Sequence, residues 1–325
     1  MKNRQYLIDN PEYTRNKAKG ALCGLAIGDS MGDAGRTDEL QKRYGISMGF
    51  SDAGAWSTDD TEFALLTAQA LLQNQGCFES GHIVDLWLKY VVSEGHLKRG
   101  GLGSTEASWN LRRGLRPPVS GQFTAHGCSD GAAMRSAPIG IVCAEKAAYL
   151  AETDASVSHS KDGIWGAQAV AVAVSMAMVD ASIGEMMDQV WRVIPKDSWF
   201  AESMHRAEQV LKNAQYNVVD AWIPLHDQIL CTYKSAVPEA ITATFSIIQL
   251  EYSDFANGMM LGCNYGRDAD TIGAVTGAIL GARLGAEAIP ESWMEQVRYP
   301  SGCCLSFTKG LDLFDVADRL AGLVQ

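Results

Sequence analysis

Long apolar runs and a positive charge excess are both missing from this 325-residue chain. Its net charge of −11 argues against a nucleic acid as the main partner, because binding a phosphate backbone requires clustered Lys and Arg. The longest uncharged stretch with a helical pattern, residues 164–179, is too short to span a bilayer and predicts a buried helix. The opening residues lack the apolar core of a secretory signal. We therefore expect no membrane association.

Paired cysteines and the common catalytic signatures are also absent. The eight cysteines include no CxxC pair, and the chain has no Asn-X-Ser/Thr acceptor for glycosylation, so we predict a reducing, cytoplasmic location. There is no Walker A sequence, no GxGxxG after a strand, no HExxH and no GxSxG. No cysteine is spaced with a histidine as a catalytic nucleophile would be. These absences argue against several large classes of nucleotide-binding protein and hydrolase.

Helical periodicity dominates the remaining pattern, and runs of alternating β-branched residues are scarce. The expected helices are Lys17–Ile27, Thr61–Leu72, Ile83–Ser93, Ile164–Val179, Ile183–Ile194, Phe200–Lys212, Ala240–Leu250, Phe255–Cys263, Thr271–Leu284 and Leu311–Leu323. No linker or break in composition interrupts them. We predict an all-α fold in one domain over residues 1–325, a compact orthogonal helix bundle, with residues 1–12 loosely held.

Many of the 32 glycines are placed periodically. Two series recur at every fourth position: Gly20, Gly24, Gly28 and Gly32, and Gly273, Gly277, Gly281 and Gly285. In a helix such residues lie on nearly one face, and each costs about 0.8–1 kcal/mol relative to Ala. Close approach of another backbone would offset that cost. Either the two helices pack on each other, or each packs against a different element.

Two acidic clusters stand where helices are expected to begin. Ser57, Thr58, Asp59 and Asp60 precede one helix, and Asp268 and Asp270 precede the other. Such residues are good helix caps, but a cap needs one carboxylate and two neighbouring ones repel. Hard oxygen ligands of this kind suit Mg²⁺, Mn²⁺ or Ca²⁺. If the clusters converge, four carboxylates can hold two divalent ions, so metal binding and capping both remain open.

These segments resemble the ADP-ribosylglycohydrolase family, which includes the dinitrogenase-reductase-activating glycohydrolase and the ADP-ribosyl-acceptor hydrolases. The resemblance rests on residues 20–32 (GALCGLAIGDSMG), 57–61 (STDDT), 130–138 (DGAAMRSAP), 158–160 (SHS), 268–274 (DADTIGA) and 288–293 (AIPESW). The motifs keep the family's order and extend over nearly the whole chain. Together they are specific, whereas any one of them alone would be weak evidence.

The resemblance implies an all-α hydrolase with two Mg²⁺ or Mn²⁺ ions at the base of a cleft. Its substrate would be an ADP-ribosylated protein or an ADP-ribose-like small molecule, cleaved between the anomeric carbon and an acceptor such as arginine or serine. The family's metal ligands carry over to Thr58, Asp59, Asp60, Asp268, Asp270 and Thr271. Of these, Asp59, Asp60 and Asp270 are the expected catalytic residues. The oligomeric state is not predicted.

The resemblance also assigns ligand contacts. They fall on Gly101, Gly103, Ser104, Gly131, Met134 and His159. In the Gly-rich segment 99–105, glycine lets backbone N–H groups approach a pyrophosphate. On the residues alone, this segment is equally typical of an ordinary loop before a helix, and a single His beside an apolar run is often structural.

Three residues depart from the family pattern. Arg36 stands where many members have a Glu, Asp130 where Asn is common, and Arg267 where Gly is common. The missing Glu puts the general base in doubt, and the nearby acids Asp33, Asp38 and Glu39 are candidate substitutes. An Arg at position 36 can instead meet a phosphate or a carboxylate.

Other functions remain open on the sequence. The substrate can be a smaller ribosyl or nucleoside compound, or the chain can be a non-catalytic member of the same fold. A metal-dependent phosphohydrolase would attack the pyrophosphate instead. Immunity against a toxin that attaches ADP-ribose to proteins is a further biological role compatible with the same chemistry.

Overall fold

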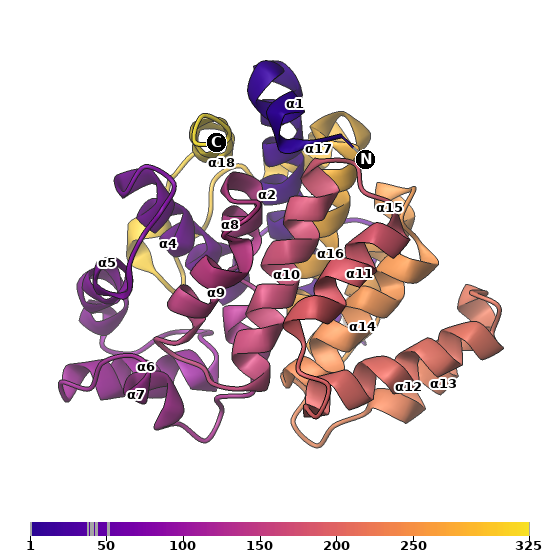
Figure 1. The fold of residues 1–325 in the computed structure, drawn as a ribbon, viewed down its shortest axis with the longest axis horizontal. Coiled ribbons are helices and arrows are strands. Elements are labelled where there is room, and N and C mark those ends of the chain that lie inside the picture. The colour runs from indigo at the N-terminus through magenta and orange to yellow at the C-terminus, as the bar shows by residue number, and fades with distance from the viewer. Residues whose placement is uncertain (1, 38, 40–41, 43–44, 51–52, 325) are drawn as a thin grey trace.

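The two glycine series lie on helices that cross the middle of the molecule side by side (Figure 1). In the computed structural model, which describes residues 2–37, 39, 42, 45–50 and 53–324, α2 (Pro11–Asp33) and α16 (Ala269–Leu284) are antiparallel. A Cβ atom on Gly24 would overlap the carbonyl of Gly277. Within these residues α2 and α16 form the most extensive helix–helix contact. Of the two alternatives that the sequence left open, packing of the two series on each other is the one that the structure shows.

The register of this contact decides which ends of the helices meet. Gly20 lies against Gly281 at one end, and Gly32 lies against Ala269 at the other. The C-terminal end of α2 is therefore next to the N-terminal end of α16. Gly285 follows α16 with a φ of 84°, a left-handed conformation that glycine adopts without strain.

Fifteen further α-helices surround this pair in the part of the chain that the structure describes. They are α1 (Arg4–Asp9), α4 (Asp59–Gln73), α5 (Ser80–Leu86), α6 (Leu102–Arg112), α7 (Val119–Gln122), α8 (Ala137–Val142), α9 (Ala147–Ala155), α10 (Asp162–Met178), α11 (Ile183–Val193), α12 (Trp199–Asn213), α13 (Val218–Ile229), α14 (Val237–Leu250), α15 (Phe255–Cys263), α17 (Glu291–Val297) and α18 (Leu313–Ala321). The described residues contain no strand, only an isolated bridge between Ser129 and Ala236. The all-α prediction is confirmed.

Most predicted helices are present with shifted ends. The run expected at Ile83–Ser93 is divided: α5 continues as a π-helix at Trp87–Val91 and ends in a 3₁₀ turn at Val92–Glu94. Helix α13 was not predicted, and Pro224 lies inside it. Proline removes one helical hydrogen bond, so the sequence pattern around Pro224 does not indicate a helix.

The N-terminal segment, predicted to be loosely held, is attached by several contacts. Leu7 of α1 is buried, and the backbone N–H of Lys2 donates to the Val179 carbonyl at 2.7 Å. The Lys2 ammonium also pairs with Asp180 at 2.9 Å. Asp180 pairs in addition with Lys17 of α2, so the segment joins the central helices through one shared carboxylate.

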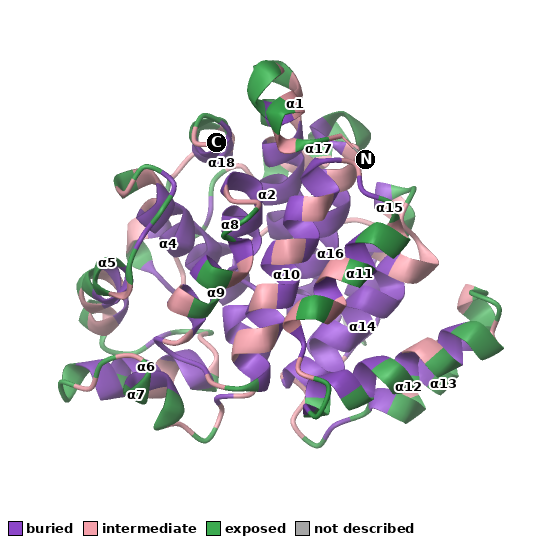
Figure 2. Ribbon diagram, in the orientation of Figure 1, coloured by how far each residue is buried: buried purple, intermediate pink, exposed green. Residues whose placement is uncertain are grey.

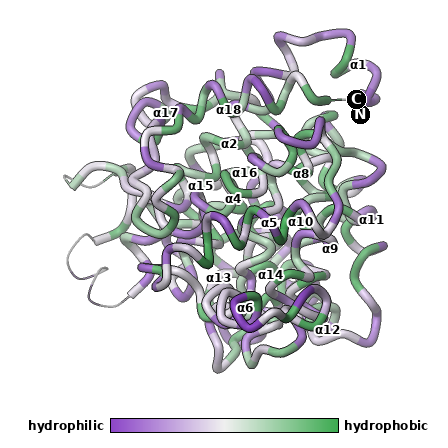
Figure 3. The backbone as a smooth tube through the Cα atoms, turned by 90° about the vertical axis from the view of Figure 1, so that its left-hand side faces the viewer, coloured by the Kyte–Doolittle hydropathy of each residue, from purple (hydrophilic) through white to green (hydrophobic). Residues whose placement is uncertain are grey.

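Burial follows the same arrangement. Helices α2, α16, α10 and α14 are largely buried, whereas α5, α12 and α13 keep an exposed face (Figure 2). The two termini lie at one end of the molecule, and α6 and α12 lie at the other (Figure 3).

All eight cysteines are free thiols. None of the described helices is long and apolar enough to cross a membrane.

Candidate active site

The site begins with Asp29, a buried carboxylate near the end of α2. It accepts hydrogen bonds from the backbone N–H groups of Thr58, at 2.8 Å, and Thr61, at 3.2 Å, and from both threonine hydroxyls, each at 2.5 Å. Asp29 thereby caps the N-terminus of α4, although it lies about thirty residues away in sequence. Burial raises the pKa of Asp29 to about 6.

The residues at the two N-cap positions do not cap their helices with their side chains. Neither Thr58 nor Asp268 makes a side-chain capping bond. Asp59 and Asp60 occupy the first turn of α4, and Asp268 and Asp270 flank the first residue of α16. The side-chain cap of α4 therefore comes from Asp29, and Asp268 makes no capping bond at α16. The packing of α2 on α16 brings the two clusters together.

The four carboxylates line one cavity of about 360 Å³. Its wall consists of Arg36, Asp59, Asp60, Gly100, Gly101, Leu102, Gly103, Ser104, Ser129, Asp130, Gly131, Met134, Thr232, Tyr233, Lys234, Ser235, Asp268, Asp270 and Thr271. The structure thus collects the predicted ligand and metal residues in one place with two exceptions. Thr58 lies behind the wall, where its hydroxyl donates to Asp29, and His159 also lies outside it.

Several of the carboxylate oxygens are buried without a hydrogen-bond donor among the described residues. They are Asp60 Oδ1, Asp130 Oδ2 and Asp270 Oδ1. Asp268 Oδ1, by contrast, lies 3.1 Å from the Arg36 guanidinium. Burial, together with the neighbouring carboxylates, raises the pKa of Asp60 and Asp270 well above the usual range. The same causes raise the pKa of Asp59 to about 7, against the opposing effect of Arg36. Such a cluster of buried carboxylates with shifted pKa values is typical of functional sites.

A Gly-rich turn forms the adjacent wall at the N-terminus of α6. The Gly101 N–H donates to Asp59 Oδ2 at 2.7 Å, and the Ser104 hydroxyl is buried with no partner in the described part of the chain. A helix N-terminus attracts anions because its first N–H groups are unpaired. This turn can therefore receive a phosphate group of a ligand.

His159 lies behind this turn. Its Nε2 is 2.8 Å from the Ser129 hydroxyl, and its Nδ1 is 2.7 Å from the Ser158 hydroxyl. A Cβ on Gly103 or Gly131 would meet the imidazole at 3.0 or 3.2 Å. Burial lowers the pKa of His159 well below its usual value, so the ring is neutral. His159 does not line the cavity, and its two ring nitrogens hold Ser129 and Ser158 beneath the glycines. Its predicted contact with a ligand stays a prediction.

Arg36, which replaces the expected Glu, forms ion pairs with the metal-ligand candidates. Its guanidinium lies 3.1 Å from Asp268 and 2.5 Å from Asp270. Among the proposed substitutes for the missing base, Asp33 does not line the cavity, and its carboxylate accepts from Arg99 and from the Trp56 indole. Glu39 does not line the cavity, and Asp38 lies outside the described residues.

The segment from Thr232 to Ser235 contributes to the wall and was not predicted. It is held by Arg267, whose guanidinium makes a bidentate pair with Glu239 at 2.5 and 2.8 Å and also donates to the Cys231 carbonyl. The Arg267 carbonyl in turn accepts from Lys234 at 3.0 Å. No local pattern marks this segment, because its position depends on a contact across roughly thirty residues.

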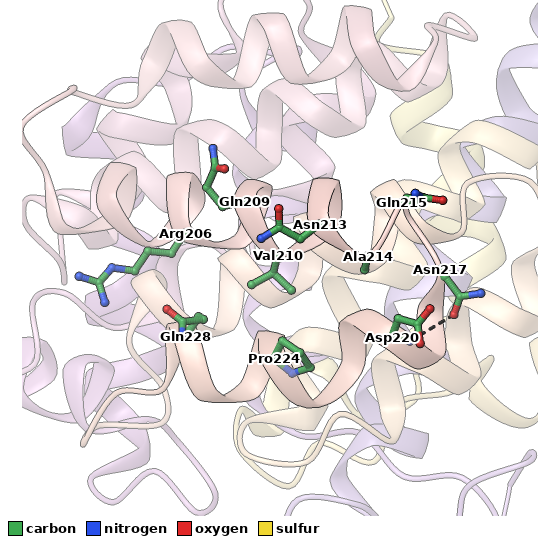
Figure 4. Close-up of a pocket in the computed structure, with 10 residues that line it drawn as sticks. All are labelled: Arg206, Gln209, Val210, Asn213, Ala214, Gln215, Asn217, Asp220, Pro224 and Gln228. Atoms are coloured by element: carbon green, nitrogen blue, oxygen red, sulfur yellow. Dashed lines mark hydrogen bonds between the residues drawn. The ribbon is translucent and has the colours of Figure 1, made fainter.

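A second hollow, of about 940 Å³, lies between α12 and α13 (Figure 4). Its ten lining residues include two charged side chains, Arg206 and Asp220. It contains no buried carboxylate cluster and none of the predicted site residues. Although it is larger, the chemistry favours the carboxylate cavity as the site.

Glu62 of α4 holds the segment of residues 303–305, and replacing it tests that contact. Its buried carboxylate accepts from the backbone N–H groups of Cys303, Cys304 and Leu305 at 2.9, 2.8 and 2.6 Å. We expect Glu62→Gln to lower the free energy of unfolding by about 2–3 kcal/mol, because the amide turns a donor toward these N–H groups. Urea unfolding measures the change. Glu202→Gln, at an exposed surface pair, should change it by less than about 0.5 kcal/mol, and equal effects would contradict the assignment.

Comparison with known proteins supports one family. The family model described as ADP-ribosylglycohydrolase matches residues 10–325. The chain belongs to the ADP-ribosylglycohydrolase family. An uncharacterized protein of Archaeoglobus fulgidus is 32% identical over 87% of this chain and 92% of its own length. The ADP-ribosylarginine hydrolase Tri1 of Pseudomonas putida is 24% identical over 89% of this chain and 76% of its own.

A solved structure shows the same fold. The ADP-ribosylglycohydrolase-related protein complex superposes with a TM-score of 0.68 and 22% identity, covering 97% of this chain and all of that one. The uncharacterized protein YegU of Escherichia coli K12 is 27% identical over 79% of this chain and 84% of its own length. Family membership supports a glycohydrolase activity in general terms.

The ADP-ribosylglycohydrolase pattern also explains one departure. Arg267 has a φ of 60°, a left-handed conformation that favours glycine, and Gly is common there in the family. In this chain the pair with Glu239 holds the strained arginine in place.

The donor set of the cavity fits a divalent cation. Its unpaired carboxylate oxygens are hard ligands of the type that Mg²⁺ and Mn²⁺ bind. Across the described ranges, however, no three His, Cys, Asp or Glu side chains stand in the arrangement of a ready metal site. The Arg36 guanidinium contacts Asp268 and Asp270 instead, and supplies part of the charge that a cation would supply.

Proposed function

We propose that the chain is a divalent-metal-dependent glycohydrolase that releases ADP-ribose from an acceptor such as an arginine or serine side chain. The observation that carries this proposal is the group of buried carboxylates with unpaired oxygens in one cavity beside a helix N-terminus. Structural carboxylates in a core are normally paired, because an unpaired buried charge destabilises the fold. This cluster therefore supports the proposal that a cation and a substrate bind here.

The residues that would hold two Mg²⁺ or Mn²⁺ ions are Asp59, Asp60, Asp268, Asp270 and Thr271, which line the cavity, and Thr58, whose hydroxyl would have to leave Asp29 to reach an ion. Bound divalent ions would orient the ribose hydroxyls and stabilise negative charge during bond cleavage. Asp59 is already fixed by the Gly101 N–H, which donates to its Oδ2 at 2.7 Å. Asp59, Asp60 and Asp270 are the proposed catalytic residues.

Other residues of the cavity would position the substrate. The N-terminus of α6 and the Ser104 hydroxyl would receive the pyrophosphate, since both offer unpaired polar groups. Lys234, 3.5 Å from Asp268, adds a positive charge on the opposite part of the wall. Leaving-group departure from an oxocarbenium-like sugar is the chemistry that such a site favours.

A second candidate follows from the size of the cavity. At about 360 Å³ it is at the small end of the range of roughly 300–1,000 Å³ for small-molecule sites. This size favours a glycosidase acting on a smaller ribosyl or nucleoside compound. The two candidates share the carboxylate site and differ in the substrate.

Product identification tests the proposal. The metal-loaded protein would be incubated with ADP-ribosyl-arginine, ADP-ribosyl-serine and a ribonucleoside, and the products separated by chromatography. The relative named ADP-ribosylarginine hydrolase makes the arginine-linked substrate the first choice. We expect intact ADP-ribose from one of the two amino-acid substrates. AMP as product would show a pyrophosphohydrolase, cleavage of the nucleoside alone would favour the second candidate, and no turnover would contradict both.

A further inference from the structure

The Arg36 guanidinium contacts two of the aspartates that the proposed metal ions would bind. Its side chain follows the end of α2 and reaches Asp268 Oδ1 at 3.1 Å and Asp270 Oδ2 at 2.5 Å. Both carboxylates are almost fully buried, whereas the guanidinium side chain retains 26% exposure. The contact therefore joins a buried acidic pair to a side chain with access to solvent.

The charges explain why the arginine is held there. Asp59, Asp60, Asp268 and Asp270 all face Arg36, and their mutual repulsion in a buried site destabilises the protein unless a cation is present. Lys234, at 3.5 Å from Asp268, is a further cation beside the group. The planar guanidinium bridges two carboxylates at once, which a single ammonium group cannot do.

A divalent ion at these aspartates and the guanidinium exclude each other. Metal–oxygen bonds of about 2.0–2.6 Å would bring the ion onto the carboxylates that Arg36 now contacts. The two positive groups would then lie within a few ångströms of each other and repel. The arginine side chain must leave its partners before the ion binds.

We propose that Arg36 is an internal counter-cation that closes the acidic site in the metal-free protein and is displaced when a divalent ion binds. This inference rests on the metal site of the proposed function. The arginine stabilises the metal-free fold and raises the metal concentration needed to load the site. Substrate hydrolysis would then require a higher metal concentration than it would without Arg36.

Calorimetric titration of the metal-free, full-length protein with Mn²⁺ tests this role. We expect Arg36→Gln to bind Mn²⁺ about tenfold more tightly or better, because the ion no longer competes with a bound charge. Arg36→Lys should have an intermediate affinity, since it keeps the charge without the bridge. Arg206→Gln, an exposed arginine of α12, is the matched control and should bind Mn²⁺ like the unchanged protein.

Thermal unfolding gives a second readout that does not depend on activity. In EDTA the Tm of Arg36→Gln should be lower than that of the unchanged protein, and saturating Mn²⁺ should remove the difference. Equal or weaker Mn²⁺ affinity in Arg36→Gln would overturn the role of Arg36 alone. If neither the unchanged protein nor any variant bound Mn²⁺, the metal site of the proposed function would itself be contradicted.

Discussion

Replacing Gly277 by leucine is expected to lower the free energy of unfolding by roughly 3–5 kcal/mol, or to prevent folding. A Cβ at this position already overlaps the carbonyl of Gly24, so the helix pair must separate to admit any side chain. Backbone atoms cannot move aside as a flexible side chain would. Even Gly277→Ala should cost about 1–3 kcal/mol for this reason. Chemical denaturation followed by circular dichroism measures both variants.

The control for this prediction is the same substitution where space is open. Gly184 is exposed near the start of α11, and a Cβ there meets nothing within 4 Å. Gly184→Leu should change the free energy of unfolding by less than about 1 kcal/mol, on the stabilising side, because leucine is the better helix former. An unchanged Tm in Gly277→Leu would show that the glycines are not required for close packing.

Replacing Asp60 by asparagine is expected to abolish measurable turnover, with a loss of about a thousandfold or more, while leaving the metal-free fold intact or more stable. Asn has the same shape but no negative charge for a cation. Burial and like charges raise the pKa of Asp60 in the folded protein. The free energy of unfolding of the unchanged protein therefore falls as the pH rises from the pKa of an unfolded Asp to the raised pKa of folded Asp60. Asparagine does not titrate, so the variant avoids this loss at pH 7.

The prediction for Asp60→Asn is therefore a loss of turnover without a loss of stability. Turnover is measured by ADP-ribose release with saturating Mn²⁺, and stability by the Tm in EDTA. Asp315→Asn, an exposed acid on α18, should leave both unchanged. Full activity in Asp60→Asn would remove Asp60 from the catalytic residues, and a large fall in Tm would indicate a structural role instead.

Much of the site could be predicted because its determinants are local in sequence. The period of four in each glycine series needs only helical geometry, and two such series suggest mutual contact. Once α2 and α16 pack antiparallel, Asp29 meets the start of α4, and Asp270 lies beside it. The acidic clusters were recognisable because they exceed what capping requires.

The rest could not be predicted because it depends on contacts between distant segments. Asp29 caps α4, and this relieves Thr58 of that role, which no spacing indicates. His159 holds Ser129 and Ser158, although a histidine near a ligand loop reads equally well as a ligand contact. The Thr232–Ser235 wall is positioned by Arg267 and Glu239. The ion pairs of Arg36 likewise exist only after the fold has formed.

The central claim is that the carboxylates gathered by the glycine-lined helices bind divalent cations. Equilibrium dialysis of the full-length protein against Mn²⁺ tests it most directly, with the double variant Asp60→Asn, Asp270→Asn as comparison. We predict about two Mn²⁺ per chain in the unchanged protein and none in the folded double variant. Absence of bound Mn²⁺ in the unchanged protein, or equal binding in the two proteins, would contradict the claim.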